Sequence, residues 1–338
     1  MKVTRIGIDL AKQVFQLHGV DRQERVVVRR RLRREQMLAY FGKLEPCLIG
    51  MEACGSAHYW ARELTKLGHT VKLMAPQHVK AYVKGNKNDA NDAEAICEAV
   101  GRPNMEFVAI KTVEQQDLQA AHRVRSLLVR QRTAKGNEIR GLLSEYGVVI
   151  SKRIDILRRA LARLVEDGER DVSDAFKILL RGLHEDLMRL DERVDALDRA
   201  IERVARDNPT AKRLQQIPGV GPVTATALVA SVGDGKQFGH ARDMAAWLGL
   251  VPRQHSSGGK DTLLGISKRG DAYLRTLLIH GARSIVRVAA KRSDRTSAWV
   301  ARISERRHPN IAAVALANKN ARIAWAMMTR DAQYVARD

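Results

Sequence analysis

The sequence is poor in cysteine and has no long apolar run. Its three cysteines, Cys47, Cys54 and Cys97, are odd in number and form no CxxC pair, which argues against a disulfide framework or a zinc site. No stretch approaches the ~18 apolar residues that a membrane span requires, and the opening Met-Lys-Val-Thr-Arg has no apolar signal core. We therefore expect a soluble protein of the reducing cytoplasm.

Acidic residues are also fewer than basic ones, 38 against 59, which gives the chain a formal charge of +21. Arginine, which grips phosphate with two parallel hydrogen bonds, supplies 41 of the basic side chains. The excess is +7 over residues 1–104, +1 over 105–207 and +13 over 208–338. This distribution predicts a polyanionic partner bound mainly by the C-terminal third. With aromatic residues at only 4%, base stacking is expected to be a minor mode.

The 338 residues are enough for about two domains of ~150 residues. Short apolar runs alternate with helical patterns over the first hundred residues, and this order predicts an α/β domain with a mixed sheet. The expected strands are 3–10, 14–20, 25–32, 47–51 and 70–74, and the expected helices are 35–44, 57–67, one starting at 76 and one starting at 89.

The middle of the chain carries a heptad pattern. Apolar residues alternate at spacings of four and three: Leu183, Leu187, Leu190, Val194, Leu197, Ile201 and Val204. This spacing indicates coiled-coil helices or a long helical hairpin, paired within one chain or between subunits, and a helix packed inside its own bundle remains the alternative. Pro209 ends the pattern because its ring disfavours helical geometry at Asn208.

The C-terminal third is predicted to be mostly helical. Gly219 and Gly221 form a turn between two helices, and Pro222 suits the first position of the second helix. Such a helix-hairpin-helix-like turn can offer backbone N–H groups to a DNA phosphate. A plain glycine turn between packed helices is the alternative. A polar loop over 255–260 and a basic helix over 271–287 follow.

Four acidic residues stand where a metal site would need them. Asp9 and Glu52 end two apolar strands, while Asp89 and Asp92 lie three apart near a helix start and share one helix face. Hard oxygen ligands in this number suit Mg²⁺ or Mn²⁺, and two such ions about 4 Å apart can hold both oxygens of a phosphoryl transfer. Each carboxylate alone could equally be structural, for example at a helix N-terminus.

A pair of serines lies in a basic, glycine-rich segment. Ser256 and Ser257 precede two glycines, so that a hydroxyl sits in a strong positive field that could activate it as a nucleophile. A linker or a phosphate contact is the simpler interpretation. The basic residues around the serines are Arg253, Lys260, Lys268 and Arg269.

Further basic side chains fall into two groups. Arg275, Arg283 and Arg287 are spaced along one helix face, as expected of contacts to a nucleic-acid backbone. The arginines within 29–34 form a second cluster, which could equally be an edge strand protected by charge.

Five motifs in chain order resemble the transposases of insertion-sequence family one-ten, most closely its eleven-eleven subgroup, a family related to Piv-type invertases. They are Ile6-Gly-Ile-Asp9-Leu-Ala-Lys, Met51-Glu52-Ala-Cys-Gly55, Asn88-Asp89-Ala-Asn-Asp92-Ala, Ile217-Pro-Gly-Val-Gly221 and Ser267-Lys-Arg-Gly270. The segment 260–265 departs from the family pattern, which affects the register of the nearby serine.

The resemblance implies a RuvC-like domain of RNase H fold over 1–110, a coiled-coil assembly segment over 111–207 and a transposase domain over 208–338. It implies a D-E-D-D metal tetrad of Asp9, Glu52, Asp89 and Asp92 binding Mg²⁺ or Mn²⁺. The resemblance also implies a catalytic serine, and the register that places it directly before glycine selects Ser257, with Ser256 as the alternative. Family members also resemble RNA-guided recombinases, in which a structured guide RNA pairs with donor and target DNA.

The sequence thus predicts a DNA recombinase that forms a covalent phosphoserine intermediate. A homo-oligomer, a dimer or a tetramer, would hold the strands together, and a nucleoid-associated protein of the cytoplasm is expected. The rival hypotheses are a RuvC-like nuclease that uses water and a DNA- or RNA-binding protein without catalysis.

Overall fold

The computed structural model describes residues 2–85, 88–167 and 173–335. Its contacts divide the chain into two compact units. The first unit comprises Met1–Val113 with Val232–Gly239, and the second comprises Glu114–Ser231 with His240–Asp338. The short segment 232–239 belongs with the first unit, where the Gln237 side chain accepts a hydrogen bond from the Ala109 N–H at 3.1 Å.

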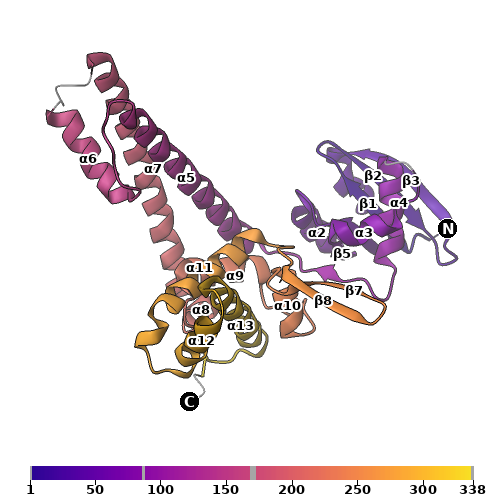
Figure 1. Ribbon diagram of the computed structural model, residues 1–338. Coiled ribbons are helices and arrows are strands. Elements are labelled where there is room, and N and C mark those ends of the chain that lie inside the picture. The colour runs from indigo at the N-terminus through magenta and orange to yellow at the C-terminus, as the bar shows by residue number, and fades with distance from the viewer. Residues whose placement is uncertain (1, 86–87, 168–172, 336–338) are drawn as a thin grey trace. The chain divides into compact units, whose positions relative to one another are not determined.

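A six-stranded mixed sheet forms the centre of the first unit within the described residues (Figure 1), with the strand order β3-β2-β1-β4-β5-β6. β1, β2 and β3 form an antiparallel meander, β4 and β5 run parallel to β1, and β6 is antiparallel to β5. The strands are β1 (Arg5–Leu10), β2 (Val14–Val20), β3 (Val26–Arg33), β4 (Leu48–Glu52), β5 (Thr70–Met74) and β6 (Phe107–Val108).

Alternate residues of β1 and β4 face two different helical layers. Ile6 and Ile8 are fully buried in a core that includes Phe41 and Trp60, so that this face of the sheet is covered by the helices that follow β3 and β4. On the opposite face Gly7 touches the backbone of the helix that begins at Asp89. The helices are η1 (Arg34–Gln36), α1 (Met37–Phe41), α2 (Ala57–Lys66), α3 (Pro76–Val79), η2 (Lys80–Tyr82) and α4 (Asp89–Val100).

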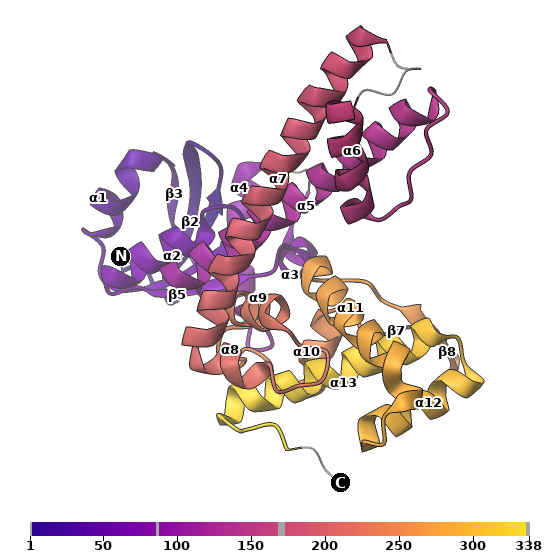
Figure 2. The same ribbon diagram turned by 90° about the vertical axis from the view of Figure 1, so that its left-hand side faces the viewer.

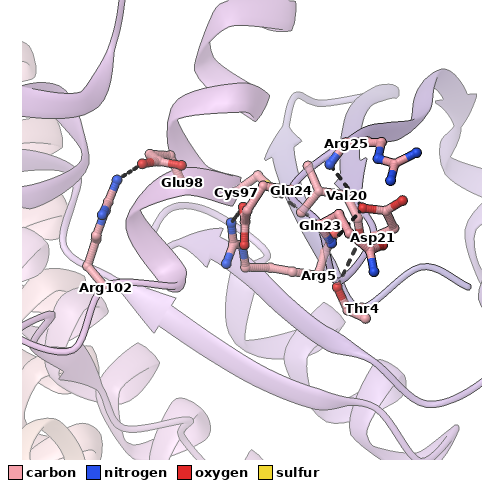
Figure 3. Close-up of polar contacts among 10 residues, drawn as sticks. All are labelled: Thr4, Arg5, Val20, Asp21, Gln23, Glu24, Arg25, Cys97, Glu98 and Arg102. Atoms are coloured by element: carbon pink, nitrogen blue, oxygen red, sulfur yellow. Dashed lines mark hydrogen bonds and ion pairs between the residues drawn. The ribbon is translucent and has the colours of Figure 1, made fainter.

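Arg5 ties the start of β1 to its surroundings (Figure 3). Its guanidinium pairs with Glu24 in the turn between β2 and β3, and its carbonyl accepts a contact from the Cys97 thiol of α4 at 3.8 Å. Asp21 closes the same turn by accepting hydrogen bonds from the N–H groups of Gln23 and Arg25. The C-terminal half of α4 therefore lies beside the start of β1.

The second unit contains a long pair of helices, α5 and α7 (Figure 2). Ion pairs join Arg125 to Asp198, Arg132 to Asp191 and Lys135 to Asp186, and this order shows that the two helices run antiparallel. The helices of this unit are α5 (Val113–Ser144), α6 (Ile154–Asp167), α7 (Asp174–Asp207), α8 (Pro209–Leu214), α9 (Pro222–Val232), α10 (Ala241–Trp247), α11 (Ala272–Val288), η3 (Ala289–Lys291), α12 (Arg295–Arg306) and α13 (Pro309–Arg330).

The heptad residues of α7 divide into two rows. Leu187, Val194 and Ile201 are buried within the chain, whereas Leu183 and Leu190 are half-buried and line a groove of about 580 Å³ between α5 and α7. The chain thus provides a partner for one side of the heptad pattern itself. A coiled coil completed by a second subunit stays a prediction.

One sequence expectation is wrong in its local structure. The segment predicted as a polar loop over 255–260 lies in a two-stranded hairpin, β7 (Pro252–Ser257) and β8 (Lys260–Ile266). Gly258 and Gly259 adopt φ of +56° and +78° and form its two-residue turn, a conformation that glycine tolerates without strain. All six residues of β7 are exposed, so the strand lacks the alternation of apolar and polar residues by which a strand is recognised in a sequence.

The described residues contain no helix that is both long and apolar enough to cross a membrane. The expected strands 14–20 and 70–74 are confirmed, and the other expected strands agree within two residues at each end. The short β6 was not expected from the sequence.

Candidate active site

Asp9 and Glu52 lie side by side at the end of neighbouring parallel strands. Ile8 of β1 pairs with Met51 of β4, and the two carboxylate residues come next on their strands. Since parallel strands in register present equivalent residues to the same face, both side chains share the face of Gly7 and Gly50. The sheet therefore brings together the first two of the predicted ligands.

The same two glycines bring α4 onto this face. A Cβ on Gly7 would lie 2.3 Å from the carbonyl oxygen of Ala93 and from the N of Cys97, and one on Gly50 would lie 2.7 Å from Val100 Cβ. Because Cys97 lies beside Arg5 and Ala93 beside Gly7, α4 runs opposite to β1. Its first turn is directed toward the end of β1 that carries Asp9.

Asn88 fixes where α4 begins. Its side-chain oxygen accepts a hydrogen bond from the Asn91 N–H at 2.9 Å, which is the usual way of capping a helix start. The cap places Asp89 in the first turn of α4, one turn before Ala93, and Asp92 one turn before Ile96. Asp89 is exposed and Asp92 is half-buried.

The pKa of Cys54, just after β4, reflects burial and the negative charges nearby. Loss of hydration raises the pKa of its thiol, and the negative charges of Glu52 and Asp9 raise this pKa further. Its N–H donates to the Glu52 carbonyl at 2.8 Å. Two carboxylates therefore act on one thiol, which agrees with their position on adjacent strands.

The donor set fits a hard divalent cation in its chemistry, since carboxylate oxygens suit Mg²⁺ and Mn²⁺. Among the described residues, however, no group of three or more His, Cys, Asp or Glu side chains is gathered closely enough to hold an ion. The backbone thus brings the four acidic positions toward one edge of the sheet, while their role as ligands stays a prediction.

The hairpin separates the two candidate serines. Ser256 donates a hydrogen bond to Asp261 at 2.6 Å, and the Gln254 amide donates to both of them, at 2.8 and 3.2 Å. These hydrogen bonds lower the pKa of Asp261. Ser257 pairs with Lys260 across the turn, and because strand residues alternate it faces the side opposite to Ser256.

The predicted basic contacts differ in their surroundings. Arg253, Lys260, Lys268 and Arg269 are exposed. Arg275 is half-buried and donates to the carbonyls of Leu248 and Arg269 at 3.0 and 2.8 Å, so it fastens the base of the hairpin. The arginines of 29–34 lie largely on β3, which is an edge strand of the sheet as the alternative interpretation proposed.

The glycine turn is part of the packing of the second unit. Gly219 has φ of +86°, and a Cβ there would lie 2.7 Å from the carbonyl oxygen of Gly281 on α11. Asn320 of α13 is buried and donates to the Pro218 carbonyl at 2.8 Å. Gly221 has open space around it. Packing therefore explains Gly219, and only Gly221 is open to an approaching group.

Sequence reasoning missed the two glycines that seat α4. A repeated pattern could have identified them, because β1 contains Ile6-Gly-Ile-Asp9 and β4 contains Ile49-Gly-Met-Glu52. In both strands a glycine precedes the acidic residue by two positions. That spacing puts an open backbone and a carboxylate on one face.

The chain is similar to known proteins over nearly its whole length. Residues 6–148 match the DEDD transposase family profile, and residues 211–297 match the profile described as "Transposase IS116/IS110/IS902 family". The chain is 55% identical to a probable family 20 transposase of Pseudomonas aeruginosa over 99% of both chains. It is 47% identical to the transposase for insertion sequence element IS1111A of Coxiella burnetii, over 97% of this chain and 90% of that protein.

A more distant similarity links the chain to a pilin gene-inverting protein of Moraxella bovis, which is 29% identical over 46% of this chain and 53% of that protein. The mixed sheet with acidic residues at its edge is consistent with a DEDD nuclease-like fold, within the class of enzymes that cleave and recombine DNA. The chain belongs to the IS110/IS116/IS902 family of transposases, which confirms the resemblance predicted from its motifs.

Proposed function

We propose that this transposase cuts and rejoins DNA by transesterification, with Ser257 as the nucleophile. Asp9, Glu52, Asp89 and Asp92 would hold Mg²⁺ or Mn²⁺. The observation that carries the proposal is the glycine-seated contact between α4 and the sheet, because it directs acidic residues from three elements toward one sheet edge.

The proposed reaction exchanges one phosphoester for another. A bond forms between Ser257 Oγ and phosphorus, and the bond between phosphorus and one deoxyribose oxygen breaks. The serine proton passes to solvent, and the leaving oxygen takes up a proton. The four carboxylates would hold a divalent cation whose positive charge would stabilise the phosphoryl oxygens. The covalent link preserves a phosphoester for rejoining, whereas hydrolysis would lose it to water.

Two features favour Ser257 over Ser256. The Ser256 hydroxyl already donates to Asp261, a carboxylate made less basic by its lowered pKa. Ser257 directly precedes the turn glycines and stands opposite Lys260. The positive charge of Lys260 favours the deprotonated form of the Ser257 hydroxyl. The same charge also attracts a phosphate group bound next to the serine.

We further propose that a structured guide RNA selects donor and target DNA, and that the chain acts as a homo-oligomer, a dimer or a tetramer. The strong positive charge suits nucleic-acid partners. The acidic positions belong to the first unit and Ser257 to the second. A composite site assembled from two subunits is therefore part of the proposal.

The test compares Ser257→Ala, Ser256→Ala and Asp9→Asn in a recombination assay with labelled DNA, followed by denaturing electrophoresis to detect a covalent protein–DNA adduct. We expect Ser257→Ala and Asp9→Asn to abolish recombination and adduct, and Ser256→Ala to retain both.

Other outcomes would point to the rival functions. Recombination that survives in Ser257→Ala, together with no adduct in the unaltered protein, would indicate a nuclease that uses water. Full activity of Asp9→Asn would contradict the metal tetrad and favour a binding protein without catalysis.

A further inference from the structure

A groove of about 310 Å³ with both polar and apolar lining residues lies in the second unit, away from the acidic residues and the serine hairpin in the sequence. One wall is a single face of α5, where Gln119, Arg123, Ser126 and Arg130 follow one another at spacings of four, three and four. Residues at such spacings stack on the same helix face. The groove therefore offers an ordered row of hydrogen-bond donors.

The two arginines of this row have the properties of ligand-binding groups. Arg123 and Arg130 are exposed, and no ion pair of either is recorded among the described residues, although Arg125 and Arg132 of the same helix are paired with α7. They are seven residues apart, which is about 10 Å along the helix axis. Two cations at this separation suit an extended polyanion better than a small ion.

A chain of hydrogen bonds joins His122 and Tyr273, which line the groove, to Thr226 beside it. Thr226 donates its hydroxyl proton to the Pro222 carbonyl at 2.8 Å, so its oxygen accepts from His122 Nε2 at 3.0 Å. His122 Nδ1 consequently accepts from the Tyr273 hydroxyl at 3.0 Å. Arg125 in turn donates to Tyr273. These hydrogen bonds link α5, α9 and α11 next to the groove.

The charge of the groove comes from few groups. Burial, with a smaller effect of Arg125, lowers the pKa of His122 to about 4, so the imidazole is neutral near pH 7. Asp271 is the carboxylate of the lining, and its Oδ1 already accepts from the N–H groups of Tyr273 and Leu274. The two arginines thus leave the groove with an excess of positive charge.

We propose that this groove binds the phosphodiester backbone of a nucleic acid, with Arg123 and Arg130 each contacting a phosphate. Gln119 and Ser126 between them supply neutral hydrogen bonds to the same strand. Such contacts position a nucleic acid without reading its bases.

The test measures how the affinity depends on salt. Duplex DNA and single-stranded RNA of matched length are titrated with the full chain and with Arg123→Gln/Arg130→Gln. Each lost phosphate contact reduces the slope of log K against log salt by about 0.9 for duplex DNA and about 0.7 for a single strand. We expect a reduction of about 1.8 on DNA or about 1.4 on RNA, and the affected probe identifies the bound strand.

Two controls make the result specific. Arg199→Gln/Arg203→Gln removes the same charge from exposed positions of α7 outside the groove lining and should leave the slope unchanged. Arg123→Lys/Arg130→Lys retains the charge and should keep the original slope. An unchanged slope on both probes, or an equal fall in the α7 control, would overturn the proposal. The measurement requires no DNA cleavage, so it is independent of the proposed serine chemistry.

Discussion

At the scale of single residues, His122 shows how a buried side chain links distant parts of the chain. It is 3% exposed and joins Tyr273, which is 151 positions away, to Thr226, which is 104 positions away. A second proton on the ring would turn Nδ1 into a donor, so that the Tyr273 hydroxyl would have to turn its own proton away. Protonation therefore disturbs this hydrogen bond and buries a charge.

This leads to a pH prediction. The pKa of His122 falls from 6.5 in the unfolded chain to about 4 in the folded protein, so the unfolded state takes up a proton first as the pH falls. The resulting loss of stability begins near pH 6.5 and is complete near pH 4. We expect about 2 kcal/mol to be lost between pH 7 and pH 5. Urea unfolding at the two pH values measures it.

The matched variant is His122→Gln, which lacks a titrating group. Its free energy of unfolding should be lower at pH 7, but it should lose about 2 kcal/mol less than the original protein between pH 7 and pH 5. The same loss in both proteins would contradict the assignment to His122.

Some of these residue-level features could be predicted from the sequence and others could not. Asp9 and Glu52 end apolar strands, and strand ends are recognisable from local pattern. The partner of Ser256 was not recognisable, because Asp261 meets it only through the register of a hairpin with no apolar alternation. The partners of His122 are too distant in the chain to leave a local pattern.

At the scale of elements, a buried carboxylate holds three helices of the second unit together. Asp191 of α7 is 5% exposed and pairs with Arg132 of α5 and Arg158 of α6. Both guanidiniums donate hydrogen bonds to the same carboxylate. The helices therefore depend on one acidic residue between two cations.

We expect Asp191→Ala to destabilise the protein by about 3 kcal/mol, because removal of the buried shared partner leaves two half-buried cations facing each other. The control is Asp186→Ala, which breaks the ion pair between Lys135 and the half-exposed carboxylate of Asp186. Its loss should cost less than about 1 kcal/mol. Urea denaturation followed by circular dichroism measures both. Equal losses would show that burial of Asp191 is unimportant.

The sequence predicts the elements of the first unit largely by itself, whereas it does not determine the antiparallel pairing of α5 and α7. Strands such as Val14–Val20 and Thr70–Met74 can be recognised, together with their first and last residues, from the apolar pattern of their own sequence. The heptads of α7 predict that a partner exists, but they do not specify whether it comes from the same chain. The ion pairs that specify α5 join residues more than 50 positions apart.

At the scale of the whole molecule, the proposed active site draws on both compact units. A mixing experiment tests whether different subunits donate its parts. Asp9→Asn keeps a working serine, and Ser257→Ala keeps a working set of acidic residues. If the site forms between subunits, mixed oligomers of these two inactive variants regain part of the recombination activity.

If each subunit completes its own site, the mixture stays inactive. A sample of each variant alone, carried through the same exchange procedure, is the control. Recovery in the mixture and in neither sample alone would establish assembly between subunits, whereas an inactive mixture of properly exchanged subunits would contradict it.

The direct seating of α4 on Gly7 and Gly50 has one more consequence. Because helix backbone rests on strand backbone at Gly7, no deformable side chain intervenes at the point that sets the height of the helix above the sheet. Rotamer changes elsewhere in the core therefore change the distance between the acidic residues of α4 and those of the strands only a little. The spacing at this point depends on non-bonded contact between two backbones, so that substitutions elsewhere in the hydrophobic interior are expected to change it little.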